Sequence, residues 1–233
     1  MSATPAPAVT LTELHVAPSI LSADFARLGA QVEEVLDAGA RVIHVDVMDG
    51  HFVPPITFGA VVVSALADLV HDAGAIIDVH LMVDRPERHV TDIAHAGADN
   101  ITIHVEATPH VHYTLQAIRE AGCRACAAIC PATPVEVLSD VWQDSLDMAL
   151  CMTVNPGWGA QSFIPHSLEK VMRLREALPD AVGLEVDGGI HEQTAGPVVH
   201  AGANVLVAGS AVFNSDDPGA TYQRIAAAAA GAG

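Results

Sequence analysis

Positive charge is the scarcest feature of this sequence. Ten Lys and Arg residues stand against 28 Asp and Glu, which gives a formal net charge of −18 over 233 residues. Nucleic acids and anionic membrane surfaces bind proteins through positive patches, and no basic run occurs here. We therefore expect no nucleic acid and no membrane as a partner, and we interpret the acidity as a feature that favours solubility.

Aromatic residues and cysteines are also few. Aromatics make up 4% of a chain that is 51% hydrophobic, so the core must consist mainly of Val, Ile, Leu and Ala, which suits a buried parallel sheet. Cys123 and Cys126 have CxxC spacing, but no second pair follows, which argues against a zinc ribbon. We expect Cys126 and Cys130, in an apolar run, to be small core residues.

Long apolar runs are missing as well. No stretch is long enough to span a bilayer, and the Ala/Pro/Thr-rich start lacks the features of a signal peptide. We expect a cytoplasmic protein with a flexible tail at residues 1–10, one catalytic domain at 11–225 and a flexible Ala/Gly tail at 226–233. The length suits a single α/β barrel, typically about 250 residues.

Short β-rich segments alternate with segments of helical periodicity along the chain. A glycine follows several of the helical segments, where it can adopt the left-handed conformation that ends a helix. Such alternation predicts a parallel sheet, and eight units favour a (β/α)8 TIM barrel. An open doubly wound sheet is the alternative, but it usually has a GxGxxG turn after its first strand. The expected strands are residues 15–21, 41–48, 75–82, 100–105, 124–129, 148–154, 182–186 and 205–208.

Polar residues occur at the ends of three of these strands, where barrel enzymes place their chemistry. Because side chains alternate along a strand, His44 and Asp46 share one face, as do Asp78 and His80. Asp187 ends the seventh strand, next to Glu185. His44, Asp46, His80 and Asp187 could bind one divalent metal per chain, Zn, Fe(II), Mn or Co. The alternative is a set of separate structural histidines and solvated acids, although burying such groups unpaired is costly.

Two further groups extend this candidate site. Met48, Met82 and Met152 lie at strand ends and could form an apolar wall, although core packing is the alternative interpretation. Glycine-rich turns follow the last three predicted strands, and small residues there let backbone N–H groups approach a phosphate. These turns contain Gly157, Trp158, Gly159, Ala160, Gly188, Gly189, Gly209 and Ser210.

The same residues lie in runs that resemble the ribulose-phosphate 3-epimerase family: PSILSAD (18–24), HVDVMDGHFVP (44–54), DVHLM (78–82), NPGWGAQ (155–161) and EVDGGI (185–190). The resemblance covers about residues 17–213. It implies interconversion of D-ribulose 5-phosphate and D-xylulose 5-phosphate, with His44, Asp46, His80 and Asp187 as metal ligands and Asp46 and Asp187 as the acid/base pair. It also implies substrate binding by Ser19, His80, Gly157, Trp158, Gly159, Ala160, Asp187, Gly188, Gly189, Gly209 and Ser210.

Three residues depart from the family pattern. Pro55 stands where Asn is usual, Ala160 where Gly is usual, and Cys130 where Asn or Lys is usual. Pro55 removes an N–H and an amide from its loop. Ala160 would crowd the phosphate loop if that position needs unusual backbone angles.

Epimerisation at C3 needs one group to remove the proton and another to return it on the opposite face, through a metal-stabilised 2,3-enediolate. Glu106 is another possible acid, although structural support is the favoured interpretation. Six histidines in the expected helices or loops, His71, His89, His95, His110, His112 and His200, are expected to face solvent. We also expect a homo-oligomer, a dimer or a hexamer, that acts on a small sugar phosphate.

Three rival functions remain open at this point. An epimerase of D-allulose 6-phosphate would keep every catalytic residue. A Schiff-base aldolase needs a strand lysine, and decarboxylases of a related barrel carry a lysine where His80 stands. The single lysine, Lys170, is expected on the helix after the sixth strand, which argues against both. A non-catalytic sugar-phosphate-binding barrel would not need carboxylates on two opposing faces.

Overall fold

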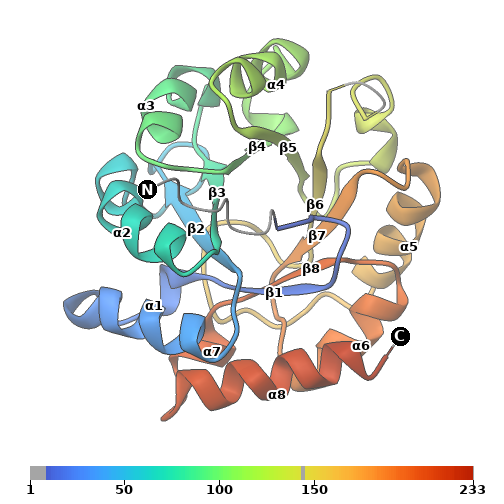
Figure 1. Ribbon diagram of the computed structural model, residues 1–233. Helices are drawn as coiled ribbons and strands as arrows, with labels where there is room; N and C mark the ends of the chain where they lie inside the picture. Colours follow the sequence, from blue (N-terminus) through green and yellow to red (C-terminus); the bar gives the residue numbers. More distant parts are fainter. Residues whose placement is uncertain (1–8, 143–144, 233) are drawn as a thin grey trace.

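The computed structural model describes residues 9–142 and 145–232. Its centre is an eight-stranded parallel sheet. The strands are β1 (His15–Pro18), β2 (Val42–Met48), β3 (Ile76–Met82), β4 (Asn100–His104), β5 (Arg124–Ile129), β6 (Met148–Met152), β7 (Gly183–Asp187) and β8 (Val205–Ala208). Figure 1 looks along the axis of this ring of strands.

The sheet closes on itself. Its hydrogen-bonded order runs β1-β8-β7-β6-β5-β4-β3-β2, and a parallel bridge between Ser19 and His44 joins the two remaining edges. The predicted (β/α)8 barrel is therefore confirmed, and the open sheet is wrong. β1 ends at Pro18, earlier than predicted, because the Ser19 hydroxyl accepts a hydrogen bond from Leu21 N and starts a 3-10 turn at Ile20–Ser22.

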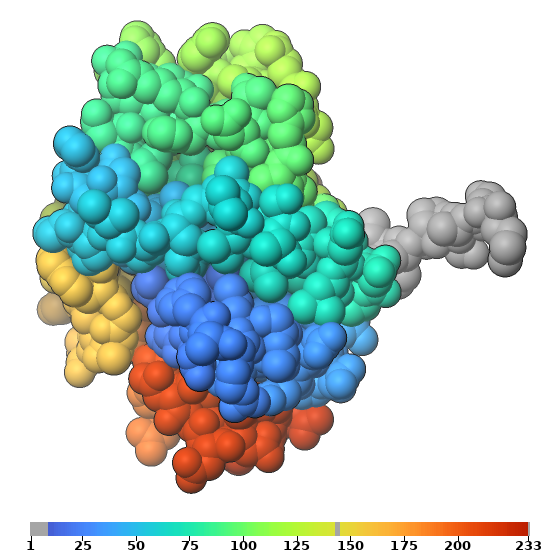
Figure 2. Space-filling view, turned by 90° about the vertical axis from the view of Figure 1, so that its left-hand side faces the viewer, coloured from blue at the N-terminus to red at the C-terminus, as the bar shows by residue number. Residues whose placement is uncertain are grey.

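Helices surround the strands. They are α1 (Leu28–Asp37), α2 (Ala60–Asp72), α3 (Val90–His95), α4 (Val111–Glu120), α5 (Ser167–Ala177), α6 (Glu192–His200), α7 (Ser210–Phe213) and α8 (Pro218–Ala230). Between β5 and β6 the described connection contains only a 3-10 turn, Val135–Leu138. Figure 2 shows one flank, where α1 and α2 lie side by side above the red C-terminal segment. No helix in the described ranges has the length and apolarity needed to cross a membrane.

Both ends of the described chain pack on the barrel. α8 continues to Ala230 with Ala229 buried, so this helix includes most of residues 226–233, the predicted C-terminal tail. At the other end Val9 is buried, and its carbonyl oxygen accepts a hydrogen bond from Arg124 at 2.8 Å. Residues 1–8 of the predicted N-terminal tail lie outside the described residues.

The barrel interior changes character along its axis. An apolar layer fills the end where the strands begin, and it includes Leu11, Val42, Ile76, Met148 and Val205. Further along the strands the buried side chains are polar, among them His44, Asp46, Asp78, His80, Asn100, Thr102, His104 and Glu185. Because buried polar groups are costly unless they are paired, this polar layer marks the part of the core that serves a purpose other than stability.

Candidate metal centre and substrate pocket

The register between β2 and β3 brings the predicted site residues into contact. His44 pairs with Asp78, Asp46 with His80, and Met48 with Met82. All six are buried, which places them on the inward face that strand alternation predicted.

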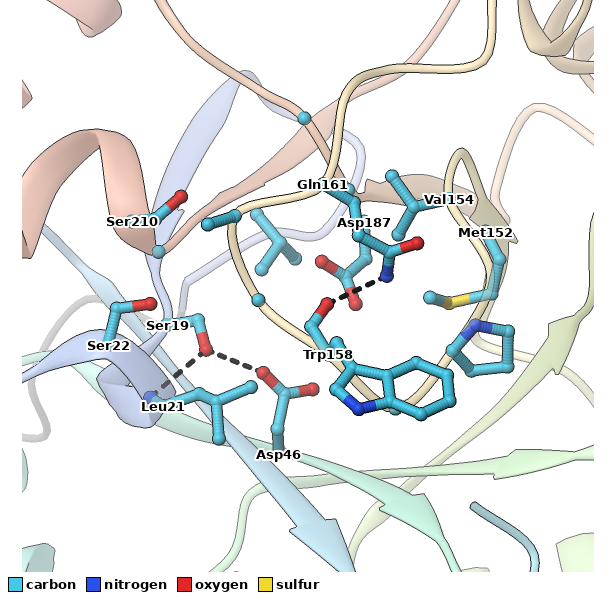
Figure 3. A pocket seen from close by; sticks show the side chains of 18 of the residues that line it. Ser19, Leu21, Ser22, Asp46, Met152, Val154, Trp158, Gln161, Asp187 and Ser210 are labelled. Carbon is cyan, nitrogen blue, oxygen red and sulfur yellow. Dashed lines mark hydrogen bonds between the residues drawn. The ribbon is translucent and has the colours of Figure 1, made fainter. Parts of the chain in front are cut away.

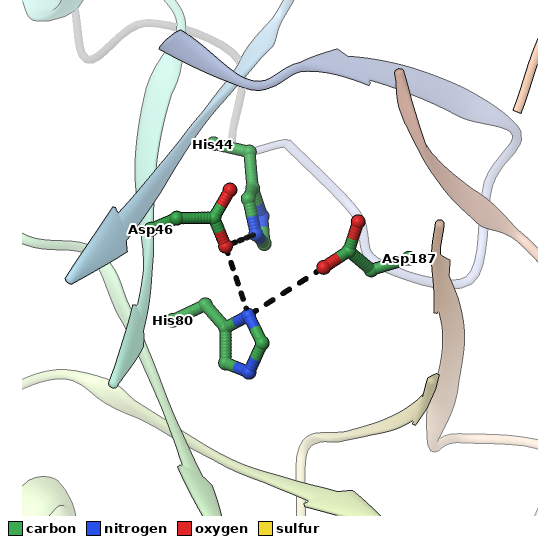
Figure 4. A group of neighbouring side chains, drawn as sticks. All are labelled: His44, Asp46, His80 and Asp187. Atoms are coloured by element: carbon green, nitrogen blue, oxygen red, sulfur yellow. Dashed lines mark hydrogen bonds and ion pairs between the residues drawn. The ribbon is translucent and has the colours of Figure 1, made fainter. Parts of the chain in front are cut away.

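Four of the inward-facing side chains converge on one point (Figure 4). The Oδ1 atom of Asp46 lies 3.3 Å from Nε2 of His44 and 3.1 Å from Nδ1 of His80. Asp187, from β7, reaches across with its Oδ2 atom 3.7 Å from the same His80 nitrogen. One nitrogen or oxygen atom from each of the four lies within 4.8 Å of the others. Two imidazoles and two carboxylates at this spacing form a donor set that suits a divalent transition metal.

His44 provides the observation that tests the fit. Its Nδ1 atom lies 2.7 Å from Oδ2 of Asp78, while its Nε2 atom, completely buried, has no hydrogen-bond partner among the described residues. The Asp46 carboxylate 3.3 Å away makes an ion-pair contact but no hydrogen bond to this atom, and a buried nitrogen without a hydrogen bond costs about 1–3 kcal/mol unless something binds it. The arrangement matches a carboxylate that orients a histidine ligand toward a metal. The residues therefore fit a divalent ion.

The charges around this point also favour a cation. Burial and, after it, the negative charge of Asp46 together raise the pKa of Asp187 to about 7. Burial opposes the ionised form of Asp46, but His44 and His80 outweigh it and hold its pKa well below the usual range. Burial lowers the pKa of His44, but the neighbouring carboxylates of Asp46, Asp78 and Glu185 outweigh it and raise this pKa well above its ordinary value. Burial and Asp78 raise the pKa of Glu185.

A second set of buried contacts lies behind His80. Its Nε2 atom is 2.9 Å from Nε2 of His104, and Nδ1 of His104 is 3.1 Å from Oε2 of Glu106. Burial lowers the pKa of His104 to about 4, so this imidazole is neutral at pH 7. Glu106 does not line the pocket described below; its position behind His104 is that of a supporting residue.

A cavity lies next to the four converging side chains, and two of them, Asp46 and Asp187, line it (Figure 3). It contains about 520 Å³ of empty space, part of it open to solvent. Asp46 and Asp187 both reach it, and Met48, Met82 and Met152 form part of its wall. The predicted substrate-binding residues that line it are Ser19, Gly157, Trp158, Gly159, Ala160, Asp187, Gly188, Gly189, Gly209 and Ser210.

One predicted substrate-binding residue lies elsewhere. His80 is completely buried beneath the cavity and is not among its lining residues. Conversely, Leu21 and Ser22 line the cavity but were missed by the sequence analysis. The PSILSAD run could have indicated these two residues, because it continues past Ser19 into the 3-10 turn at Ile20–Ser22.

The glycine-rich turns form the upper part of the cavity. The amide of Gln161 donates to the carbonyl oxygens of Asn155 at 2.7 Å and of Trp158 at 2.8 Å, which ties the loop after β6 to itself. Gly189 has φ +68°, and a Cβ atom there would lie 2.5 Å from the backbone N of Phe163. A larger residue could not occupy this turn without moving the adjacent loop.

The three departures from the family pattern have distinct surroundings. Ala160 has φ +58°, the left-handed region that favours glycine, so the unusual backbone angle does occur there. Pro55 lies against Gly157. Cys130 is half-buried and its sulfur is 3.5 Å from Nδ1 of His104, so the prediction of a core position was wrong for Cys130, whereas Cys126 is fully buried.

No lysine side chain lines the described part of this site. Lys170 lies on α5, where its Nζ atom donates to the carbonyl oxygen of Cys130 at 2.6 Å and to that of Pro131 at 3.2 Å. Neither Lys nor Arg is among the lining residues of the cavity. The six histidines predicted to face solvent do lie on the surface: His71, His89, His95, His110, His112 and His200.

Solved structures of several barrel enzymes share the fold. 3-Hexulose-6-phosphate synthase from Salmonella typhimurium superposes with a TM-score of 0.69 at 18% identity, over 95% of this chain and 100% of that one. Orotidine 5'-phosphate decarboxylase from Pyrococcus horikoshii OT3 superposes with a TM-score of 0.67 at 16% identity, over 92% of this chain and 99% of that one. At these identities the likeness is one of fold alone.

Sequence comparison is more specific. Ribulose-phosphate 3-epimerase of Bacillus subtilis (strain 168) is 48% identical over 209 residues, which cover 88% of this chain and 94% of the relative. The protein of that name from Synechocystis is 52% identical over 206 residues, 86% and 87% of the two chains. The model of the ribulose-phosphate 3 epimerase family matches residues 15–213. The chain belongs to the ribulose-phosphate 3-epimerase family.

Proposed function

We propose that this protein interconverts D-ribulose 5-phosphate and D-xylulose 5-phosphate by metal-dependent epimerisation at C3. The observation that carries the proposal is the placement of Asp46 and Asp187. They come from β2 and β7, reach one cavity from different sides, and share a cluster with two histidines (Figure 4). Inversion of a carbon centre needs two proton-transferring groups in such a placement.

The two aspartates, Asp46 and Asp187, carry out the proton transfers. One carboxylate removes the C3 proton, and the electron pair left behind delocalises onto the C2 carbonyl to give a 2,3-enediolate. The other aspartate, as the carboxylic acid, donates its proton to the opposite face of C3. A divalent ion held by His44, Asp46, His80 and Asp187 supplies electrostatic stabilisation of the developing negative charge. Zn, Fe(II), Mn and Co all suit this nitrogen and oxygen donor set.

The glycine-rich turns are the proposed phosphate site. Gly157–Ala160, Gly188–Gly189 and Gly209–Ser210 all line the cavity, while no described lining residue is Lys or Arg. Backbone N–H groups would then bind the phosphate, which explains how so acidic a chain accepts an anionic substrate. The homo-oligomeric state, dimer or hexamer, and the cytoplasmic location stay predictions.

One assay separates the candidate functions. Purified protein is incubated with D-ribulose 5-phosphate and, in parallel, with D-allulose 6-phosphate, before and after treatment with a chelator. We expect epimerisation of the pentose phosphate, loss of activity with the chelator and recovery on adding a divalent metal. Faster turnover of the hexose phosphate would identify the sister epimerase. Binding of both compounds without turnover would indicate a non-catalytic barrel.

A further inference from the structure

Three side chains in contact with one another, His80, His104 and Glu106, lead from the candidate metal cluster to the outer rim of the barrel. His80 faces the cluster with Nδ1, and its Nε2 lies 2.9 Å from Nε2 of His104. Nδ1 of His104 in turn lies 3.1 Å from Oε2 of Glu106. Both histidines are completely buried, and their rings stack at 5.0 Å between centroids. Water is thus excluded from the two imidazoles.

The contact between two ring nitrogens determines where the protons lie. At 2.9 Å one Nε2 atom must carry a hydrogen and the other must accept it. A metal on Nδ1 of His80 leaves the hydrogen of that neutral ring on Nε2, which is therefore the donor. His104 must then accept through Nε2 and carry its own hydrogen on Nδ1, where Glu106 is the acceptor.

Glu106 is itself held in place. Its Oε1 atom accepts a hydrogen bond from the backbone N–H of Cys130 at 2.8 Å and another from the hydroxyl of Thr133. These two donors occupy one carboxylate oxygen and leave Oε2 for His104. The carboxylate thus ends a chain in which each hydrogen points outward, away from the metal cluster.

We propose that Glu106 and His104 are positioning residues that hold His80 in the tautomer with a free Nδ1, ready to bind the metal. The inference rests on the proposed metal site. Asp46 makes this function necessary, because its carboxylate lies 3.1 Å from Nδ1 of His80 and would otherwise favour a hydrogen on that atom. The outer carboxylate opposes this by favouring the hydrogen on Nε2.

A second metal ion is the competing interpretation of the same residues. His104, Glu106 and Cys130 offer ligand atoms within 4.8 Å of one another. A metal on Nδ1 of His104 would place the hydrogen of that ring on Nε2, directly against the hydrogen on Nε2 of His80. Two metals would therefore oppose each other across the 2.9 Å contact, and the geometry favours a single ion at His44, Asp46, His80 and Asp187.

Glu106→Gln is the sharpest test, because it keeps the shape and reverses one hydrogen bond. The donors from Cys130 and Thr133 hold the amide oxygen at the Oε1 position, so the NH2 group faces Nδ1 of His104. His104 must then move its hydrogen to Nε2, and His80 must carry its own on Nδ1. We expect zinc affinity, measured by competition with a chromogenic chelator, to fall about 10–100-fold, with no change in the melting temperature of the metal-free protein.

Cys130→Ala is the matched control. It removes a second side chain next to His104 but keeps the backbone N–H that binds Glu106. We expect one zinc per chain and wild-type affinity in this variant. In zinc-loaded wild type labelled with 15N-histidine, the shifts of His104 should show a protonated Nδ1 and an unprotonated Nε2.

The outcomes separate this inference from the proposed function. A wild-type protein that binds no metal would refute the proposed metal site itself. Wild-type zinc affinity in Glu106→Gln, or a protonated Nε2 on His104, would refute only the role of Glu106 and His104. Two zinc ions per chain in the wild type and one in Cys130→Ala would replace it with the second metal site.

Discussion

The Nδ1 atom of His44 lies 2.7 Å from Oδ2 of Asp78, and the opposite ring nitrogen faces Oδ1 of Asp46 at 3.3 Å. The ring is therefore oriented by a carboxylate on one side and presented to the candidate metal on the other. Asp78 is in turn oriented by Asn100, whose amide donates to Oδ1 at 3.1 Å.

This arrangement predicts the effect of Asp78→Asn. The Asn100 amide requires an acceptor at the Oδ1 position, so the new NH2 group must face Nδ1 of His44. A donor there forces the imidazole hydrogen onto Nε2, the atom that binds the metal. We expect metal affinity to fall about 10–100-fold, measured by chelator competition. Unchanged affinity would mean that Asp78 does not orient His44.

The two aspartates are tested by Asp46→Asn and Asp187→Asn in protein whose metal content has been measured. Loss of a general acid or base typically costs about 10²–10⁴-fold in rate. In each loaded variant we expect epimerisation to fall by about this factor. At least one variant should still exchange the C3 proton of one epimer with heavy water, because one face keeps its base.

Metal content is the necessary control for these two variants, since both side chains belong to the metal cluster. Variants that have lost the ion are compared after reloading. Near wild-type epimerisation by both loaded variants would contradict the two-aspartate mechanism.

The backbone conformation of Ala160 predicts that its replacement by glycine stabilises the fold. Its φ of +58° lies in the left-handed region, which costs a residue with a Cβ atom about 1–2 kcal/mol. Glycine removes this strain but adds about 0.5–1 kcal/mol of unfolded-state entropy. We expect Ala160→Gly to raise the free energy of unfolding by about 0.5 kcal/mol, measured by urea denaturation. The control is Ala65→Gly in α2, exposed on a helix, where the same change should cost about 1 kcal/mol. Equal losses at both positions would contradict strain at Ala160.

The surroundings of Cys130 predict that its thiol reacts slowly with disulfide reagents. Burial and the negative charge of Glu106 raise its pKa to about 12. Only the thiolate reacts with disulfide reagents, so at pH 8 labelling of Cys130 in the folded protein should be far slower than in urea. Labelling should accelerate as the pH rises toward 12, and Glu106→Gln should make it faster at every pH, because one of the two causes is removed. Mass spectrometry of the labelled peptides identifies the site, and labelling as fast as in urea would contradict the raised pKa.

The sequence by itself determined the elements and the direction of the site residues. Hydrophobic segments of strand length alternate with segments of helical periodicity. Eight such pairs of strand and helix favour a closed barrel. The period of two along a strand directs His44 and Asp46 inward whatever the rest of the chain does. The ends of parallel strands meet at one end of a barrel, so the convergence of four potential metal ligands and three glycine-rich turns also followed from the sequence.

Only the tertiary structure decided which of these inward side chains touch. Contact between His44 and Asp78 depends on the register of β2 with β3, and contact between His80 and His104 depends on ring orientations in a closed interior. Neighbours on other strands set these orientations, and no local pattern encodes them. The half-buried place of Cys130 and the burial of Ala229 are non-local in the same way. A sequence pattern reports which way a side chain points, whereas its partner is fixed by segments distant in the chain that fold against it.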